Sequence, residues 1–304
     1  MIGRMAIVAT GSIAFDHIMT FRDHFKNHIL PEKVHMISVS FLLDSLDRRR
    51  GGCAANISYN LALLGHRPLL FGTAGRDFGE YRASLDKAGV DTTYAAVIEE
   101  ELTASAFITT DLADNQIIGF YPGAMGHAHN LSLEDVRSPI DVVVISPNDP
   151  PAMLKYADEC RRLGHAFIFD PGQSIPAFSG DDLTGAARGA NLVIGNDYEL
   201  ELVRSKTGMS PGDLLELTPL VVQTLGEKGS HLIAREREFA VPAIKPRRIA
   251  DPTGAGDAFR AGLLLALQAG VEIETAAKVG TLAATYCVEA SGPQGHSARS
   301  RRMR

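Results

Sequence analysis

The chain has 304 residues, of which 45% are hydrophobic and 22% are charged, and its formal net charge is −6 at pH 7. A chain of this length can bury one large core or two modest ones. The acidic balance lacks the basic footprint of a nucleic-acid-binding protein, and we expect the short Arg-rich end, SARSRRMR, to be a solvated tail.

The three cysteines, Cys53, Cys160 and Cys287, are widely separated and match neither a disulfide framework nor a zinc-binding spacing. They suit a reducing compartment, so we expect a cytoplasmic protein. No apolar run reaches the ~18 residues of a membrane span. The start, MIGRMAIVATG, runs directly into a strand pattern and is interpreted as folded protein rather than as a signal peptide.

Short, continuous apolar runs predict strands that are buried on both faces, as in a parallel sheet. In chain order they are MAIVATG, PLLFGTAG, DVVVIS, AFIFD, NLVIGN and LVVQTLG. Helical periodicity occurs over 53–64, 78–88, 151–163, 197–206, 255–269 and 273–289. Because strands and helices alternate, the sequence predicts an α/β fold with helices on both faces of a mostly parallel sheet.

Two segments depart from this alternation. Residues 13–50 contain no clear βα unit, and residues 92–122 alternate as antiparallel strands do, in TASAFITTD and NQIIGFYPG. They suggest a small β lid that excludes water from reacting groups, with an ordinary edge hairpin as the alternative. No repeat, low-complexity tract or linker divides the chain, so we expect one domain over 1–304.

Ligands of parallel sheets bind at the carboxyl ends of the strands. The polar residues that follow the predicted strands are therefore candidate site residues, namely Ser12, Asp16, Asn148, Asp170, Asn196 and Thr224.

The stretch DPTGAGDAFRAG places a glycine turn at the start of an apolar helix. It is not a Rossmann motif, because Phe259 stands where the third glycine belongs, and the chain has no P-loop pattern. Such a turn exposes free N–H groups at the positive end of a helix dipole, which favours an anion. A spectator Asp257 would repel that anion, so we interpret it as a base facing an acceptor hydroxyl. A helix-capping Asp is the alternative.

Two earlier motifs could hold that acceptor. The pair Gly51-Gly52 lets the backbone approach a ligand closely, and Asn56 lies one turn into the following helix, where its amide could bind a polyol. Asp16 could accept hydrogen bonds from two neighbouring hydroxyls, as ribose presents them. A loop glycine pair and a loop Asp are the alternatives.

Two later motifs could serve a nucleotide. Asn196 and Glu199 share one face at a helix start, and their oxygens suit a hydrated Mg²⁺ on phosphates, although a capping box has the same spacing. The turn in QTLGEKGS could place Lys228 along a nucleotide.

In their order along the chain, these motifs resemble the ribokinase-like (PfkB) carbohydrate and nucleoside kinases, over residues 5 to about 296. DPTGAGDAFRAG matches one family pattern, and GGCAAN with the following helix matches the other. The resemblance implies a three-layer α/β/α sandwich with a small β lid, with Mg²⁺ and ATP as the phosphoryl donor.

The resemblance also implies a role for each matching position. Asp257 would be the catalytic base, and the amides of Gly254, Ala255, Gly256 and Asp257 would form an anion hole. The acceptor would lie on Ser12, Asp16, Gly51, Gly52 and Asn56. Asn196, Thr224, Gly226, Lys228 and Gly229 would line the ATP cleft, and Asn196 and Glu199 would organise Mg²⁺ through water.

Several stretches are more similar to bacterial adenosine kinases of the mycobacterial sort than to ribokinase, namely TGSIAFDHIMTF, HFKNHILPEKVHMISVSFLLD, GFYPGAM, NDPPAM and DPGQS. This similarity implies that Gln173 contacts the base and that Phe107 and Phe120 sandwich the purine, since a flat base gains from stacking on aromatic rings. Lid core or a dimer contact is the alternative for the phenylalanines.

The end of the chain departs from the family. Gly295 stands where relatives often have Glu in a QEH stretch, and the chain ends where relatives commonly continue with a further helix. We therefore expect an altered cover on the ATP side.

The loop at 290–292, with Asp251 and Thr253, resembles a monovalent-cation site, which implies activation by K⁺.

We therefore predict ATP-dependent phosphorylation of the 5′-hydroxyl of adenosine to AMP in purine salvage, by a homodimer that associates through the lid. A kinase for inosine, guanosine or ribose is the first alternative. A non-catalytic nucleoside or nucleotide sensor is the second.

Overall fold

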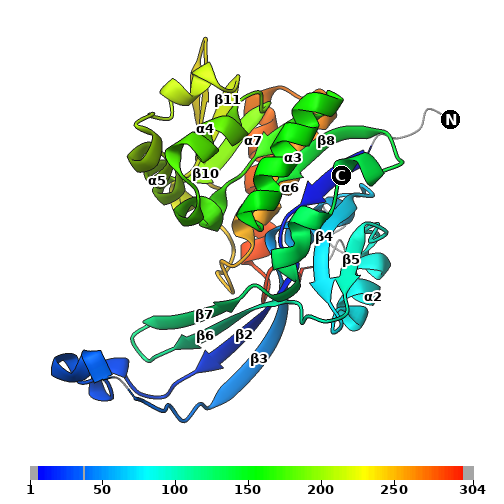
Figure 1. Cartoon of the computed structure of the whole chain (residues 1–304). Coiled ribbons are helices and arrows are strands. Elements are labelled where there is room, and N and C mark those ends of the chain that lie inside the picture. Colours follow the sequence, from blue (N-terminus) through cyan, green and yellow to red (C-terminus); the bar gives the residue numbers. More distant parts are fainter. Residues whose placement is uncertain (1–5, 37, 297–304) are drawn as a thin grey trace.

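The computed structural model describes residues 6–36 and 38–296. The predicted tail at 297–304 and the first residues of the chain lie outside these ranges. The described residues form a nine-stranded sheet, surrounded by helices, and a four-stranded sheet that projects from it (Figure 1). No described helix combines the length and the apolar character that crossing a membrane requires.

The large sheet has the strand order β13-β12-β11-β10-β9-β8-β1-β4-β5. Its strands from β5 to β11 in this order are parallel, and β12 and β13 extend it antiparallel. The strands are β1 (Ala6–Thr10), β4 (Leu69–Gly75), β5 (Ala95–Ile98), β8 (Ile140–Ile145), β9 (Ala166–Phe169), β10 (Leu192–Asn196), β11 (Leu220–Thr224), β12 (Ser230–Ala234) and β13 (Glu238–Val241).

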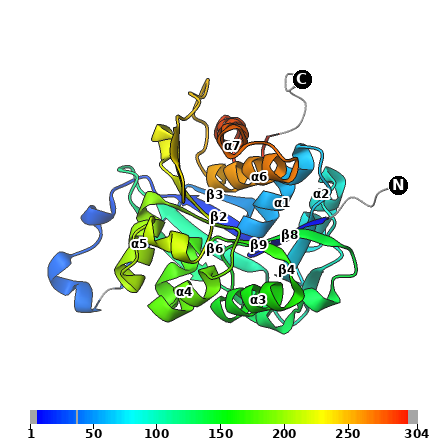
Figure 2. The ribbon, with the colours of Figure 1, turned by 90° about the horizontal axis from the view of Figure 1, so that it is seen from above.

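Helices cover both faces of this sheet (Figure 2). On one face lie α1 (Cys53–Leu63), α2 (Gly79–Ala88), α6 (Ala255–Gln268) and α7 (Ile273–Val288). On the other lie α3 (Pro150–Leu163), α4 (Gly180–Ala187) and α5 (Asp197–Thr207). Short 3₁₀ segments are η1 (Phe25–Asn27), η2 (Pro31–Met36), η3 (Gly123–Asn130), η4 (Leu133–Asp135), η5 (Gly172–Ala177), η6 (Asp213–Glu216) and η7 (Gly226–Lys228).

Two hydrophobic cores, one on each face of the large sheet, explain why the strands are apolar at every position. In β1, Ile7 and Ala9 pack into the core under α1 and α6, whereas Val8 packs into the core under α3. Successive side chains of a strand point to opposite faces, so a strand between two helical layers needs apolar residues at every position. The predicted mostly parallel sheet with helices on both faces is confirmed.

Some elements were not predicted. Helix α4 contains two glycines, Gly180 and Gly185, and it starts at a capping box between Ser179 and Asp182 rather than at an apolar stripe. The antiparallel strands β12 and β13 are five and four residues long. Their apolar patterns are too short to predict strands.

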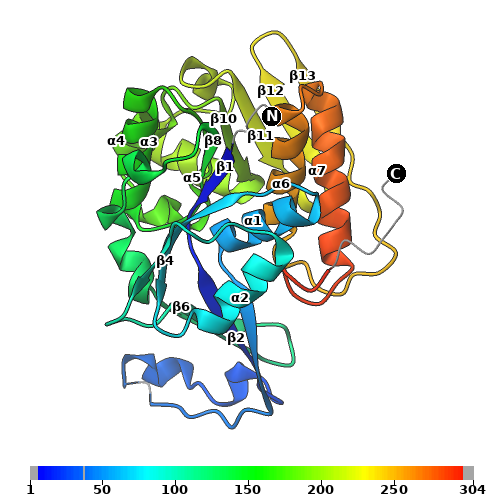
Figure 3. The same ribbon diagram turned by 90° about the vertical axis from the view of Figure 1, so that its right-hand side faces the viewer.

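The four-stranded sheet, which we call the lid sheet, has the order β3-β2-β6-β7. Its strands are β2 (Ala14–Thr20), β3 (Ser45–Gly51), β6 (Ala104–Thr110) and β7 (Gln116–Tyr121). They come from the two ranges that interrupt the βα alternation, and β6 and β7 pair within this sheet rather than at the edge of the large one. The chain passes from β1 straight into β2 (Figure 3). One domain over 1–304 and a closing role for this sheet stay predictions.

Gly52 brings the lid sheet and the large sheet together. It has φ +91°, and a Cβ atom there would lie 2.5 Å from Ser12 O and 2.6 Å from Ala14 N. Only glycine permits both this conformation and this approach. The first turn of α1 therefore lies directly against the β1–β2 connection.

Candidate active site

A cavity of about 600 Å³ lies between the lid sheet and the carboxyl ends of the central strands. We call it the acceptor cavity. Its volume is in the range of small-molecule sites. Ten of the predicted site residues line it, namely Ser12, Asp16, Gly52, Asn56, Phe120, Asn148, Gln173, Thr253, Gly254 and Asp257. Its apolar wall of Ala106, Ile108, Ile118 and Met125 was not predicted as part of the site.

Two more cavities continue along the same edge of the large sheet. The central cavity, about 310 Å³, is lined by residues that include Asp170, Asn196, Glu199, Arg260 and Asp257. The outer cavity, about 380 Å³, is lined by residues that include Thr224, Gly226, Gly229, Ala255 and Phe259. Asp257 lines both the acceptor and the central cavity, and Thr224 lines both the central and the outer cavity. The three form one path with Asp257 at the first junction.

Asp257 lies in the first turn of α6. Its Oδ2 accepts a hydrogen bond from Asn56 Nδ2 at 2.9 Å, which joins α6 to α1. Burial raises the pKa of Asp257 to about 6, against the opposing charge of Arg260 and the hydrogen bond from Asn56. A carboxylate with a pKa close to neutral is suited to remove a proton from a hydroxyl group.

The turn before Asp257 presents the start of α6 to the cavities. Gly254 has φ +80°, and a Cβ atom there would lie 2.4 Å from Pro293 Cβ, so this position requires glycine. The N–H of Ala255 donates to Pro252 O at 3.2 Å and is partly used within the turn. The amides of Gly256 and Asp257, in the first helical turn, have no partner within an α-helix and can bind an anion.

Arg260 was not predicted as a site residue. It lies three residues after Asp257 on α6, where its Nη2 donates to Asp170 Oδ1 at 2.7 Å, and the two side chains are 10% and 2% exposed. Both residues line the central cavity, where the Asp170 carboxylate neutralises the charge of Arg260. The lone arginine in the apolar stretch AFRAGLLLAL was the available sequence signal.

Asn196 and Glu199 form the capping box that their spacing also fits. Asn196 Oδ1 accepts from Glu199 N at 2.8 Å, and Glu199 Oε2 accepts from Asn196 N at 2.7 Å. Both residues also line the central cavity. Burial, with the charge of Asp170, raises the pKa of Glu199.

The oxygen atoms of Asn196 and Glu199 on the wall of the central cavity fit a hydrated Mg²⁺ rather than a metal ion that protein side chains hold alone. Among the described residues, no group of three His, Cys, Asp or Glu side chains could hold a metal ion. Mg²⁺ usually keeps several waters and binds one or two carboxylates plus substrate phosphates. Glu199 supplies such a carboxylate on the wall of the central cavity.

Ser12 and Asp16 lie on the lid side of the acceptor cavity. Ser12 Oγ accepts from the N–H of Cys53 at 2.9 Å, at the start of α1. Asp16 lies on β2, where burial raises its pKa and the charge of Arg49 lowers it. Gly51 lies behind Asp16, because a Cβ atom at Gly51 would be 2.5 Å from Asp16 Oδ2, and it does not line the cavity.

Two predicted residues lie away from the cavities. Ala106 and Ile108 of β6 line the acceptor cavity, so Phe107 between them points to the opposite face of the lid sheet, where its ring stacks on His17 at 4.7 Å. Within one chain, Phe107 and Phe120 therefore do not form the predicted sandwich around a purine. Lys228 is exposed and lines none of the three cavities, although Gly229 beside it lines the outer one.

Comparison with known proteins agrees with this architecture. The chain matches the pfkB family of carbohydrate kinases over residues 12–300. It belongs to this family. The protein is therefore a phosphotransferase that acts on a hydroxyl group, as the sequence predicted.

Its relatives include nucleoside kinases. The nucleoside kinase of Methanothermobacter thermautotrophicus is 32% identical over 297 residues, which cover 95% of this chain and 91% of that protein. The structure of Burkholderia thailandensis nucleoside kinase in complex with inosine has a TM-score of 0.87 and 36% identity, and the match covers 96% of this chain and 93% of that one. A complex of the same kinase with ADP-inosine has a TM-score of 0.84. These relatives are nucleoside kinases rather than adenosine kinases specifically, so the nearer resemblance to adenosine kinases stays a prediction.

Proposed function

We propose that the protein transfers the γ-phosphoryl group of ATP to the 5′-hydroxyl of a purine nucleoside, with adenosine as the first candidate acceptor. The observation that carries this proposal is the position of Asp257 at the junction of two cavities. One cavity is walled by polar and apolar residues that suit a nucleoside, and the next one is lined by Gly256 and Asp257, whose free N–H groups at the start of α6 suit phosphates.

The acceptor cavity favours a nucleoside over a free sugar. Its wall carries the Phe120 ring and the aliphatic side chains of Ile108 and Ile118, which can cover a flat base. Asn148, which is 2% exposed, lines the same cavity, and its Oδ1 and Nδ2 have no hydrogen-bond partner among the described residues. A buried amide without partners is costly, and a nucleoside can satisfy it.

The proposed reaction follows from this geometry. The 5′-oxygen forms a bond to Pγ, the bond from Pγ to the bridging oxygen of ATP breaks, and ADP leaves. Asp257 accepts the proton of the hydroxyl. The N–H groups of Gly256 and Asp257 stabilise the negative charge on the transferring group. Mg²⁺, when bound with ATP near Glu199, would neutralise phosphate charge.

ATP would place its base in the outer cavity. Ile244, Ile249, Phe259 and Ala284 supply apolar surface there, and Gly226 and Gly229 supply backbone that a nucleotide can approach closely. This position of ATP directs its phosphates along the central cavity toward Asp257.

Inosine is the second candidate acceptor, because the related Burkholderia thailandensis kinase has been solved with inosine. The Asn148 amide offers both a donor and an acceptor, so it can pair with the amino group of adenine or with the oxo group of hypoxanthine.

A homodimer through the lid sheet is also proposed, since Phe107, Ile117 and Leu46 of this sheet are exposed.

An ADP-release assay with adenosine, inosine, guanosine, cytidine and ribose tests the proposal. We expect the highest kcat/KM for adenosine, then inosine, with ribose far lower. Higher kcat/KM for ribose or cytidine than for both purine nucleosides would contradict it. Nucleoside binding by calorimetry without ADP release in Mg·ATP would favour the sensor instead.

A further inference from the structure

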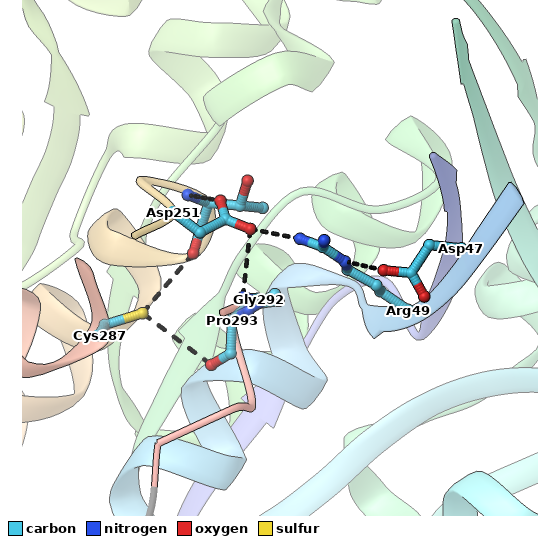
Figure 4. A network of polar contacts seen from close by, with 7 residues as sticks. Asp47, Arg49, Asp251, Cys287, Gly292 and Pro293 are labelled. Carbon is cyan, nitrogen blue, oxygen red and sulfur yellow. Dashed lines mark hydrogen bonds and ion pairs between the residues drawn. The ribbon is translucent and has the colours of Figure 1, made fainter. Parts of the chain in front are cut away.

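Asp251 begins the turn that leads through Gly254 into α6, and both of its carboxylate oxygens are engaged (Figure 4). Oδ1 accepts from the N–H of Thr253 at 2.9 Å. Oδ2 accepts from the N–H of Gly292 at 3.1 Å and from Arg49 Nη1 at 2.5 Å. The Asp251 side chain is 12% exposed.

Arg49 reaches this turn from the lid sheet. It lies on β3, 202 residues before Asp251 in the chain, and its side chain is 28% exposed. Its Nε donates to Asp47 Oδ2 at 2.7 Å while Nη1 contacts Asp251, so one guanidinium spans two carboxylates (Figure 4). A guanidinium keeps its charge at every physiological pH.

The residues here do not fit the K⁺ site that the family resemblance implied. On one side of the turn, the Arg49 guanidinium already provides the positive charge next to Asp251. On the other side, the Cys287 thiol lies 3.6 Å from Thr253 O and 4.0 Å from Pro293 O, so it occupies the space beside these two carbonyl oxygens. Burial raises the pKa of Cys287 to about 12, so the thiol is neutral. A K⁺ ion would have to displace the thiol and lie close to a like charge.

We propose that Arg49 acts as a built-in cation that positions the turn before Asp257 and makes the enzyme independent of monovalent cations. Arg49 is a positioning residue, because it contacts the anion-binding turn through Asp251 and lines none of the three cavities. Since it belongs to β3, it also joins the lid sheet to that turn. This inference deepens the proposed kinase function and rests on it for its activity readout.

The neighbouring charges support this role. Asp16 lies close enough for both residues to act on it: Arg49 lowers its pKa and Asp251 raises it. With Arg49 removed, Asp251 would remain a largely buried carboxylate without its cation, beside a turn that has to receive phosphate. Loss of Arg49 should therefore create a need for another cation that the natural protein does not have.

The natural protein provides the first test. After exhaustive dialysis, kcat with adenosine or inosine and the unfolding temperature by circular dichroism are measured in potassium, sodium and choline chloride at equal ionic strength. We expect all three salts to give the same values. A several-fold rise of kcat, or a higher unfolding temperature, in K⁺ alone would overturn the proposal.

The variant Arg49→Ala provides the second test, with Arg48→Ala as the matched control. Arg48 is the preceding residue of β3 and pairs with Asp77 at 2.6 Å instead. We expect Arg49→Ala to lose at least about tenfold in kcat in choline, equivalent to ~1.4 kcal/mol, and to regain part of it in K⁺ or in millimolar guanidinium. Arg48→Ala should not respond to these cations. Equal losses in both variants without cation rescue would overturn the proposal.

The double variant Arg49→Ala/Asp251→Asn covers the case in which Arg49→Ala is poorly folded. Removing both charges should raise its unfolding temperature above that of Arg49→Ala and abolish the response to K⁺. A K⁺ response as large as in the single variant would contradict the role of Arg49. If the natural protein phosphorylates no nucleoside, the proposed function fails, yet the effect of K⁺ on the unfolding temperature of Arg49→Ala still decides the role of Arg49.

Discussion

Asn56 Nδ2 donates a hydrogen bond to Asp257 Oδ2 at 2.9 Å. This bond joins α1 to α6, although the two residues are 201 positions apart in the sequence. The other end of the same amide, Oδ1, accepts from Gln294 Nε2 at 2.9 Å. Because Gln294 donates there, the NH₂ group of Asn56 must face Asp257. The orientation of the proposed base therefore depends on a residue near the end of the described chain.

Replacing Asp257 by Asn should lower kcat by ~10²–10⁴-fold, the usual range for loss of a general base. The acceptor and the ATP cavities are otherwise unchanged, so the nucleoside Kd measured by calorimetry should change little. Asp181→Asn, at an exposed carboxylate of α4, is the matched control and should retain full activity. Turnover of Asp257→Asn close to that of the natural enzyme would rule out the base.

The rate should fall on the acid side as Asp257 becomes protonated, with a midpoint near its pKa of about 6. Gln294→Leu removes the bond that orients the Asn56 amide. That amide stabilises the Asp257 carboxylate, so the midpoint should move to higher pH, while activity at alkaline pH recovers most of its value. The profile of kcat against pH checks both expectations. An unchanged midpoint in Gln294→Leu would show that Asn56 keeps its orientation without Gln294.

Asp257 should also reduce stability at neutral pH. Its pKa is about 6 in the folded protein, above the ordinary 3.8 of an Asp side chain, so the folded state binds the proton more tightly than the unfolded state does. Stability contributed by the protonated group is therefore lost as pH rises from about 4 to about 6. Asp257→Asn should unfold at a higher temperature than the natural protein at pH 7–8, and this difference should vanish near pH 4. Thermal unfolding across that pH range measures it, and equal temperatures throughout would contradict it.

Phe120 and Phe107 offer a matched pair on opposite faces of the lid sheet. Phe120→Ala removes a ring from the acceptor cavity, and stacking of a base on an aromatic ring contributes about 1–3 kcal/mol. The Kd for adenosine should therefore rise by roughly 5- to 150-fold. Phe107→Ala removes only the ring stacked on His17 and should leave this Kd unchanged. Equal effects of the two changes would mean that the cavity does not hold the base at Phe120.

Asn148→Asp should separate the two purine acceptors. A carboxylate only accepts hydrogen bonds, whereas the amide can also donate. We expect the variant to retain phosphorylation of adenosine, whose amino group donates, and to lose phosphorylation of inosine, whose oxo group accepts. The ratio of kcat/KM for the two nucleosides measures this. An equal loss for both would place Asn148 at the ribose instead of the base.

Much of the site was predictable, because its signals are local. The stretch DPTGAGDAF predicts both the glycine turn and the helix that begins at Ala255, and the apolar runs predict the parallel sheet that places the strand ends together. The residues that follow those strands, such as Ser12 and Asn196, line the expected edge. Arg260 was missed because an arginine within an apolar helix indicates no partner until Asp170, 90 residues away, is placed beside it.

The sequence by itself determined the family, the α/β alternation and the position of Asp257 at a helix start, since each depends on periodicity or on motifs within about one supersecondary unit. Only the tertiary structure decided that Phe107 faces away from the cavity and that Arg49 pairs with Asp251. The first depends on the register of β6 in the lid sheet, where a shift of one residue would exchange the two faces. The second depends on how the lid sheet meets the start of α6, a contact between segments 202 residues apart, which no local pattern encodes.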